Sequence, residues 1–421
     1  MPASIPPRDS VSVGMLKLRR AIVLDAGSPG SGPEQQLVIE LDGHSRPALA
    51  DVALVGVAQT GDEVIVNTQA LDLGLGSGGF DVVHVNLSSG LEGAEDRDPA
   101  RSHVMKLNYT SLQHAVAPVE ELSLPEQELP AGPQQRPVAV LALHGQLAAV
   151  AWAFAQAFPD GRLGYVQTMG GALPGGHSRA VRTLRERGLL AGHLTAGAAF
   201  GGEGEAITTI GALDHGLRVL GWDTAICGPG PGIVGSSSPL GHGGMAALDS
   251  AHAALALGAP TLLVARMSSG DPRARHRGIS HHTLTVLDLL LAPVTVALPA
   301  GMRSPAGADL RAGLRSVGLG AVFGGVLPPR QALELDVKRP TDRRPASITR
   351  HDWRRAIIDL PAYAAAGLPA ETMGRGLTED PLFFGAALAA GATLAELARD
   401  AEHGEDRAEE AERSVAPPGT R

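Results

Sequence analysis

Residues 137–168 read PVAVLALHGQLAAVAWAFAQAFPDGRLGYVQT. Short apolar runs at the two ends flank a stretch with helical spacing, so this segment is predicted to form a strand, a helix and a second strand. The alternation continues along the chain through the strand-like runs AGHLTAG, DTAIC, APTLLVA, APVTVALP and AVFGGVL. Because right-handed crossovers join parallel neighbours, the repeat predicts an α/β fold, a doubly wound and mostly parallel sheet with helices on both faces. A closed barrel is the alternative.

The region before this repeat has a different pattern. From residue 15 to residue 121, short β-branched runs such as QQLVIELDG and GDEVIVN are cut by turns. This spacing predicts a small N-terminal β-barrel or sandwich. The glycine-rich stretch LGLGSGG at 73–79 is interpreted as a tight corner of that domain or as backbone reserved for a ligand or the second domain.

Composition places the remaining boundaries. Residues 1–14 are expected to be disordered, and residues 122–136 (LSLPEQELPAGPQQR) have the Pro, Gln and Glu content of a linker. The α/β domain then spans 137–400 with a helical C-terminal part. Residues 401–421 are expected to be a disordered, solvated tail.

Charge and cysteine content exclude several classes of protein. The net charge of −9 and the 3% aromatic content argue against a nucleic-acid or anionic-membrane surface. Neither a signal peptide nor a membrane-spanning run is recognised in the sequence. The lone Cys227 permits no internal disulfide and fits a reducing compartment, so a cytoplasmic protein is expected. Only three residues are lysines, so arginine is the default cation of this chain.

Polar and glycine residues follow each predicted strand of the sheet. His144, Thr168, Glu203, Cys227 and Arg266 begin or lie in these loops, whereas the loops at the opposite edge are plain turns. Ligands bind beyond the carboxyl ends of the strands in open parallel sheets. The sequence therefore predicts a polar ligand site at this edge.

The loop at 228–238, GPGPGIVGSSS, is the clearest single feature. Its glycines could turn backbone N–H groups toward one anion, and the following helix could offer its positive end. The spacing fits neither a P-loop nor a dinucleotide fingerprint. The alternative is a proline-stiffened turn that seats the helix. The predicted ligand-binding residues of the loop are Gly228, Gly230, Gly232, Gly235, Ser236 and Ser237.

A second feature is the run DPRARHRGISHHT at 271–283. Its cations could hold an acidic ligand, with Asp271 orienting one arginine, and Ser280 is predicted to cap a helix that begins at His281. Adjacent helical residues point about 100° apart, so only one of His281 and His282 is expected to face the site. The alternative is a basic surface loop. The predicted ligand-binding residues are Arg266, Asp271, Arg273, Arg275 and His276, and the predicted catalytic residues are His281, His282 and Glu203.

Metal binding is not assigned from the sequence. The chain has 15 histidines but neither a His-x-x-x-His pair with an intervening Glu nor a cysteine pair. A discontinuous site from His144, Glu203 and His282 is the weaker alternative. Cys227 is interpreted as a small buried strand residue, and the segment TMGRGLTEDP at 372–381 as a helix-capping segment rather than part of the site.

Several segments together resemble an uncharacterised bacterial family of domains of unknown function, number 3866, of Gram-positive type. The resemblance rests on NTQALDLGLGSGGFDVVHVN, HVMKLNYTSLQ, GPGIVGSSSPLGHGG, RMSSGDPRARHRGISHHTLTVL and TMGRGLTEDPLFF. It implies no reaction, cofactor or substrate.

Two functional hypotheses follow. In the first, the protein is an enzyme that acts on a small phosphorylated or carboxylated metabolite through histidine general acid–base chemistry. In the second, it is a non-catalytic, homo-oligomeric binding or regulatory protein that senses an anionic metabolite. A purely structural module is a third option. The expected partner is a small anion in either of the first two cases, with neither nucleic acid nor a membrane involved.

Overall fold

A computed structural model of the chain describes residues 16–28, 32–74, 79–89, 91, 102–122, 134–236, 238–302 and 350–415. The chain divides into two compact units, Met1–Arg97 and Asp98–Arg421, which are described separately below. The expected disordered start at 1–14 and the core of the expected linker lie outside the described residues, as do the predicted strand AVFGGVL and residues 75–78 of the glycine-rich stretch.

The first unit is a closed five-stranded barrel, which confirms the predicted small β domain. Its strands pair in the order β1-β2-β3-β5-β4, and all neighbours are antiparallel except β3 and β5. Alternate residues such as Ala21, Val23, Val64 and Val66 point inward because side chains alternate along a strand. The elements are β1 (Leu18–Ala26), β2 (Glu34–Leu41), β3 (His44–Asp51), α1 (Val52–Val55), β4 (Glu63–Asn67), α2 (Gln69–Asp72) and β5 (Asp81–Asn86).

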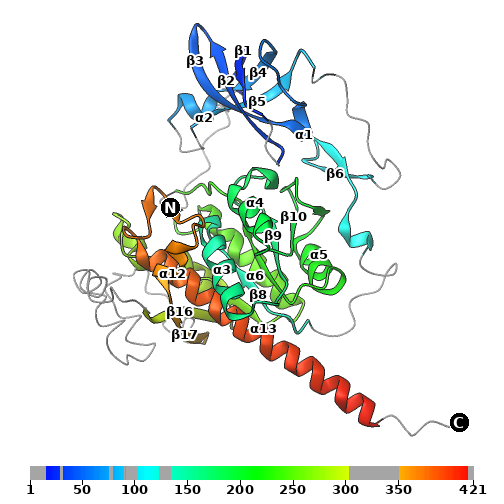
Figure 1. Ribbon diagram of the computed structural model, residues 1–421, viewed down its shortest axis with the longest axis vertical. Coiled ribbons are helices and arrows are strands. Elements are labelled where there is room, and N and C mark those ends of the chain that lie inside the picture. Colours follow the sequence, from blue (N-terminus) through cyan, green and yellow to red (C-terminus); the bar gives the residue numbers. More distant parts are fainter. Residues whose placement is uncertain are drawn as a thin grey trace, which may run out of the picture. The chain divides into compact units, whose positions relative to one another are not determined.

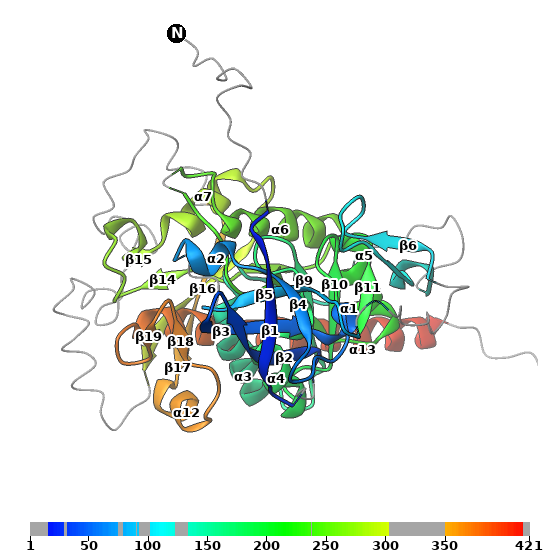
Figure 2. The ribbon, with the colours of Figure 1, turned by 90° about the horizontal axis from the view of Figure 1, so that it is seen from above.

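The second unit contains the predicted parallel sheet. Eight strands, all parallel, lie in the order β11-β10-β9-β12-β8-β13-β16-β17. Figure 2 shows β9, β10 and the edge strand β11 side by side. Two strands, β11 and β17, were not predicted. The strands are β8 (Val138–Val140), β9 (Leu163–Thr168), β10 (Gly192–Ala196), β11 (Gly204–Ala206), β12 (Thr224–Pro229), β13 (Thr261–Leu263), β16 (Thr295–Met302) and β17 (Asp352–Ile358).

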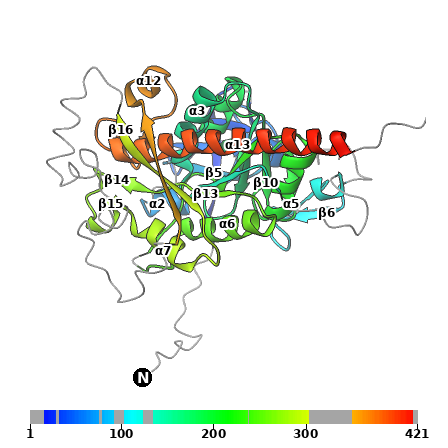
Figure 3. The ribbon, with the colours of Figure 1, turned by 90° about the horizontal axis from the view of Figure 1, so that it is seen from below.

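Helices cover both faces of this sheet, as the sequence predicted (Figure 3). Along β8, Ala139 packs into one hydrophobic core while Val138 and Val140 pack into the other, so the strand is buried on both sides. One face carries α3 (Leu147–Ala157), α4 (Arg179–Glu186), α12 (Leu360–Ala365) and α13 (Pro381–Val415), and the other carries α5 (Thr209–Asp214), α6 (Ala246–Ala256) and α7 (His281–Leu289).

The last helix, α13, is longer than the sequence indicated. It packs along α3 and continues to Val415, so it extends through much of the segment expected to be a solvated tail (Figure 1). Within the described residues, its portion Pro381–Gly404 is long and apolar enough to cross a membrane by length and composition. Most of that portion is buried against the sheet and α3, which is the setting of a core helix.

The second unit begins before its sheet, with residues 102–122. It forms β6 (Val104–Lys106), β7 (His114–Val116) and the turn η2 (Val119–Leu122). The buried ammonium of Lys106 donates to the carbonyls of Gly197, Ala199 and Ala206, at 2.8 to 2.9 Å. These bonds tie the hairpin to β11 and to the connection between β10 and β11.

Trp222 shows why several glycines are needed inside the fold. Its indole is 1% exposed and packs against the backbone of β9 and β10. A Cβ added at Gly164 would lie 1.9 Å from the indole ring, and one at Gly192 would lie 2.7 Å from it. These strand glycines therefore make room for an aromatic side chain.

Candidate functional site

The order of the strands defines where a ligand site is expected. The chain leaves β8 through α3 on one face to reach β9, and leaves β12 through α6 on the other face to reach β13. Because β8 and β12 are neighbours, the connections diverge at their carboxyl ends. This divergence is the topological switch point at which open α/β sheets bind ligands. His144, which follows β8, lies there.

His144 is built into a buried polar network. Its Nε2 lies 2.7 Å from Ser178 Oγ, and its Nδ1 lies 3.2 Å from the Tyr165 hydroxyl and 3.3 Å from the Pro229 carbonyl. Ser178 Oγ also accepts from the backbone N–H of Val181 and so caps α4. Every polar atom of the imidazole thus has a protein partner, which indicates a structural role for His144.

This network leads to a prediction about acid stability. Burial lowers the pKa of His144 to about 4. In the unfolded chain the imidazole has a pKa near 6.5. Between about pH 6.5 and 4 it is therefore protonated in the unfolded state but neutral in the folded state, which favours unfolding. We expect up to about 3 kcal/mol of stability, present above pH 6.5, to be lost through this residue as the pH falls to 4. Urea unfolding of wild type and His144→Gln between pH 7 and 4 measures this loss, and an unchanged pH dependence in the variant would contradict it.

The glycines of the 228–238 loop have mainly packing roles. A Cβ at Gly228 would lie 2.7 Å from Leu141 Cβ, and one at Gly230 would lie 2.3 Å from the Ala172 carbonyl oxygen. Gly232 has φ +73°, a conformation that favours glycine. The loop therefore packs backbone against backbone on the loop that follows β9. This packing fits the alternative of a proline-stiffened turn, and the anion-binding role of the loop stays a prediction.

The serines of the loop also bond within it. The backbone N–H and the hydroxyl of Ser236 both donate to the Gly241 carbonyl, at 2.7 and 2.9 Å. Ser237 lies outside the described residues. Gly235 pairs with His242 in an isolated β-bridge, which brings that histidine back beside the start of the loop.

His242 connects this loop to the second predicted feature. Its ring is stacked on that of His282, with the ring centroids 3.5 Å apart and the planes 10° from parallel. The loop and the histidines at the start of α7 therefore meet, as the sequence analysis required. His242 itself was not predicted, because a histidine between glycines at 241–244 carries no recognisable motif.

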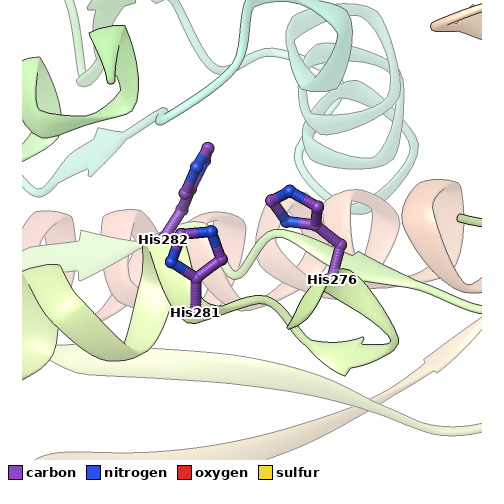
Figure 4. Close-up of side chains that lie close together, drawn as sticks. All are labelled: His276, His281 and His282. Atoms are coloured by element: carbon purple, nitrogen blue, oxygen red, sulfur yellow. The ribbon is translucent and has the colours of Figure 1, made fainter. Parts of the chain in front are cut away.

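Four imidazoles gather at this place, and we call His242, His276, His281 and His282 the histidine cluster. The centroids of His276 and His282 are 4.9 Å apart, and those of His281 and His282 are 4.4 Å apart. Figure 4 shows three of these rings converging from the turn at Ala274–His276 and from the first residues of α7. Both adjacent histidines join the cluster, although one was expected to point away. Side chains 100° apart around a helix axis are not on opposite faces, so two imidazole side chains can both reach the same place.

Hydrogen bonds hold two of these rings in place. Ser280 caps α7 as predicted, its Oγ accepting from the backbone N–H of His282 at 3.2 Å, and the same oxygen lies 2.7 Å from His276 Nδ1. Burial, reinforced by neighbouring arginines, lowers the pKa of His276 to about 3. The ring is therefore neutral at neutral pH.

The other two rings retain ring nitrogens without partners. His281 Nε2 is buried without a hydrogen bond, and neither ring nitrogen of His242 has a partner of standard hydrogen-bond geometry. Burial lowers the pKa of His242, and the nearby Pro239 carbonyl opposes that effect. Buried polar atoms normally have partners. These unpaired nitrogens mark the cluster as a place where a ligand could supply the missing hydrogen-bond partners.

Arg266, which follows β13, brings a positive charge to the cluster. It is 2% exposed, and its Nη1 donates to His282 Nδ1 at 2.8 Å. Its nearest carboxylate oxygen, Asp271 Oδ2, is 3.6 Å away, beyond hydrogen-bond distance. Burial lowers the pKa of Arg266 to about 10, so it stays charged at neutral pH.

Two fully buried carboxylates lie on the other side of Arg266. Asp271 receives a bidentate pair of hydrogen bonds from Arg273, both 2.9 Å long. Although burial would raise it, these bonds hold the pKa of Asp271 well below its usual range. Asp380 accepts from Ser268 Oγ at 2.6 Å, and Arg375 links the two carboxylates at 3.4 and 3.2 Å.

Arg375 and Asp380 come from the segment interpreted as a helix-capping segment. In the structure it forms the hairpin β18 (Glu371–Thr372) and β19 (Arg375–Gly376) before α13, and its side chains complete the charged side of the site. The polar TEDP sequence was the only signal that could have indicated this role. The three arginines and two carboxylates leave this side with a net positive charge.

Two predicted site residues are placed differently. Glu203 directly precedes the edge strand β11 and pairs with Arg185 at 2.7 Å. Five strand spacings separate β11 from β13, roughly 24 Å at ~4.8 Å each, so Glu203 is not part of the histidine cluster. The alternative metal site from His144, Glu203 and His282 is excluded for the same reason. Arg275 is exposed in the turn before His276.

The chain matches a protein family. A family model described as "Protein of unknown function (DUF3866)" matches residues 47–391. The match covers part of the barrel and the sheet unit as far as the first third of α13, including the whole histidine cluster. A search of curated proteins found no match.

Proposed function

Because the chain belongs to the family described as protein of unknown function DUF3866, whose description carries no activity, we propose a function from the site itself. The protein binds a small phosphorylated or carboxylated metabolite between Arg266 and the histidine cluster. The lone, buried Cys227 supports a reducing, cytoplasmic setting for this activity.

The state of Arg266 is the observation that carries the proposal. A guanidinium that is 2% exposed has lost most of its hydration, and the only carboxylate within 4 Å of it among the described residues, Asp271, is already engaged by Arg273. An uncompensated buried charge is costly. A phosphate or carboxylate beside Arg266 would provide the missing charge-assisted hydrogen bonds. Imidazole N–H groups of the cluster would add further donors.

The arrangement also supports chemistry on the bound anion. A neutral imidazole has one donor and one acceptor nitrogen, so a histidine beside the substrate can pass a proton. The loop at 228–238 would contribute by carrying His242 into the cluster rather than by cradling a phosphate. In this first form of the proposal the protein is an enzyme that uses histidine general acid–base chemistry.

One observation favours the second form, a non-catalytic and homo-oligomeric protein that senses the anion. Both buried carboxylates of the site, Asp271 and Asp380, accept hydrogen bonds from arginine side chains. Neither is therefore placed to act as a general base. The N–H donors of the arginines and imidazoles are sufficient to bind an anion without any catalytic step.

Thermal unfolding tests the proposal. We expect inorganic phosphate or citrate to stabilise the wild type, by about 2.7 kcal/mol at a concentration 100 times the Kd. In Arg266→Met, which keeps an apolar side chain of similar length, the stabilisation should disappear. Arg354→Met removes an exposed arginine on β17 and should leave it intact.

A stabilisation that survives in Arg266→Met would contradict the proposal. The two forms are separated by turnover of a phosphate ester such as p-nitrophenyl phosphate. Turnover that is lost in His281→Ala identifies an enzyme, and stabilisation without turnover identifies a binding protein.

A further inference from the structure

We propose that His276, His281 and His282 form a binding site for one divalent transition-metal ion of the zinc or cobalt class. Each residue offers a ring nitrogen, and the three nitrogens lie within 4.8 Å of one another. Imidazole is a preferred ligand of these metals, and sites that keep an open position commonly use three protein ligands. This inference goes beyond the proposed function, because the metal site stands on its own geometry.

The surroundings of His276 and His281 suit them as ligands. Ser280 Oγ, 2.7 Å from His276 Nδ1, can accept the proton of that nitrogen and leave the lone pair of Nε2 for a metal. Such a partner behind the ring is the usual way in which a ligating histidine is oriented. His281 Nε2 is buried and has no hydrogen-bond partner, so it makes no protein contact that a metal would have to displace.

At His282, a metal ion would compete with Arg266 for the imidazole. A neutral imidazole has one free lone pair, and Arg266 Nη1 donates to Nδ1 of this ring at 2.8 Å. A metal on Nδ1 would displace Arg266, and a metal on Nε2 would require a proton on Nδ1, which could then no longer accept from Arg266. In both cases the metal and Arg266 compete for His282. Metal binding therefore releases the guanidinium toward another partner.

That partner is expected to be the anion of the proposed function. Arg266, Arg273 and Arg375 make a dication unfavourable in this place unless negative charge accompanies it. An anion that bridges the metal and the released Arg266 would satisfy both. Each ligand should then raise the affinity of the other by the same factor.

Cobalt titration of the full chain after treatment with a chelator tests the inference. We expect wild type to bind one equivalent of Co²⁺ and to develop the intense visible bands of low-coordinate cobalt. His281→Ala, which alters a partly exposed residue, should weaken binding by at least about 100-fold, beyond the effect of losing an outer-shell partner. His276→Ala should do the same. His252→Ala, a histidine of α6 outside the cluster, should not change it.

Absence of a cobalt spectrum in wild type, or equal affinity in wild type and His281→Ala, would overturn the inference. Arg266→Met separates it from the proposed function. With the competitor removed, this variant should bind Co²⁺ at least as tightly as wild type while its response to phosphate is lost. Cobalt binding together with a retained phosphate response would refute the anion site and leave the metal site standing. A phosphate response of the expected kind without cobalt binding would refute the metal site alone.

Discussion

Replacing Asp271 by asparagine is expected to lower the free energy of unfolding by about 3–5 kcal/mol at neutral pH. Asp271 is fully buried, receives the bidentate pair from Arg273 and lies within 3.6 Å of Arg266 and Arg375. Without its charge, three arginines would repel one another in a poorly solvated place. Urea unfolding followed by circular dichroism measures the change.

Asp352→Asn is the matched control for this experiment. Asp352 pairs with Arg354 at 2.8 Å, but both side chains are substantially exposed, so the loss should stay below about 1 kcal/mol. If Asp271→Asn is no more destabilising than this control, then the charged side of the site does not contribute to the stability of the fold. The expected difference would show that the negative charge of Asp271 is needed to keep the three arginines close together.

The second large effect is expected from Gly164→Ala. The new Cβ would lie 1.9 Å from the buried indole of Trp222, and the ring is also confined by Gly192 and Gly216. Overpacking a core usually costs about 1–3 kcal/mol. Since the indole is enclosed by backbone on several sides, we expect at least about 3 kcal/mol here. Thermal or urea unfolding monitored by tryptophan fluorescence provides the measurement.

Gly404→Ala is its control, because a Cβ at this exposed position of α13 meets nothing within 4 Å. Alanine favours a helix over glycine by about 1 kcal/mol, so this variant should be equal to or more stable than wild type. Similar destabilisation by both substitutions would mean that Trp222 does not pack as described.

The sequence alone predicted the fold class and most of the strands. The alternation of apolar runs with helical stretches predicted the parallel sheet, and the β-branched runs before it predicted the small β domain. Both follow from local periodicity, which is set by the geometry of strands and helices. Strands β11 and β17 were missed because GEA at 204–206 is too short to show a period and DWRRAII at 352–358 carries charges.

The site was recognised only in part. Arg266, Asp271, His276 and the pair at the start of α7 stood out because they crowd one stretch of sequence. Glycines were harder to interpret, since Gly228 and Gly230 of the loop make close packing contacts and Gly232 has a positive φ. The same residue type satisfies a tight packing contact and an anion cradle, and sequence does not distinguish the two.

By itself, the sequence determined that this chain folds into a doubly wound α/β unit after a small β-barrel or sandwich and that charged and imidazole groups follow its fifth predicted strand. Only the tertiary structure decided which distant residues join them. His242, which precedes α6 in the sequence, joins the histidines that follow α6. Arg375 and Asp380 join them from the segment around the start of α13, and Glu203 lies at the far edge of the sheet. The order of the strands explains which residues meet. This order results from the long-range packing of whole elements and cannot be read from the local periodicity of the sequence.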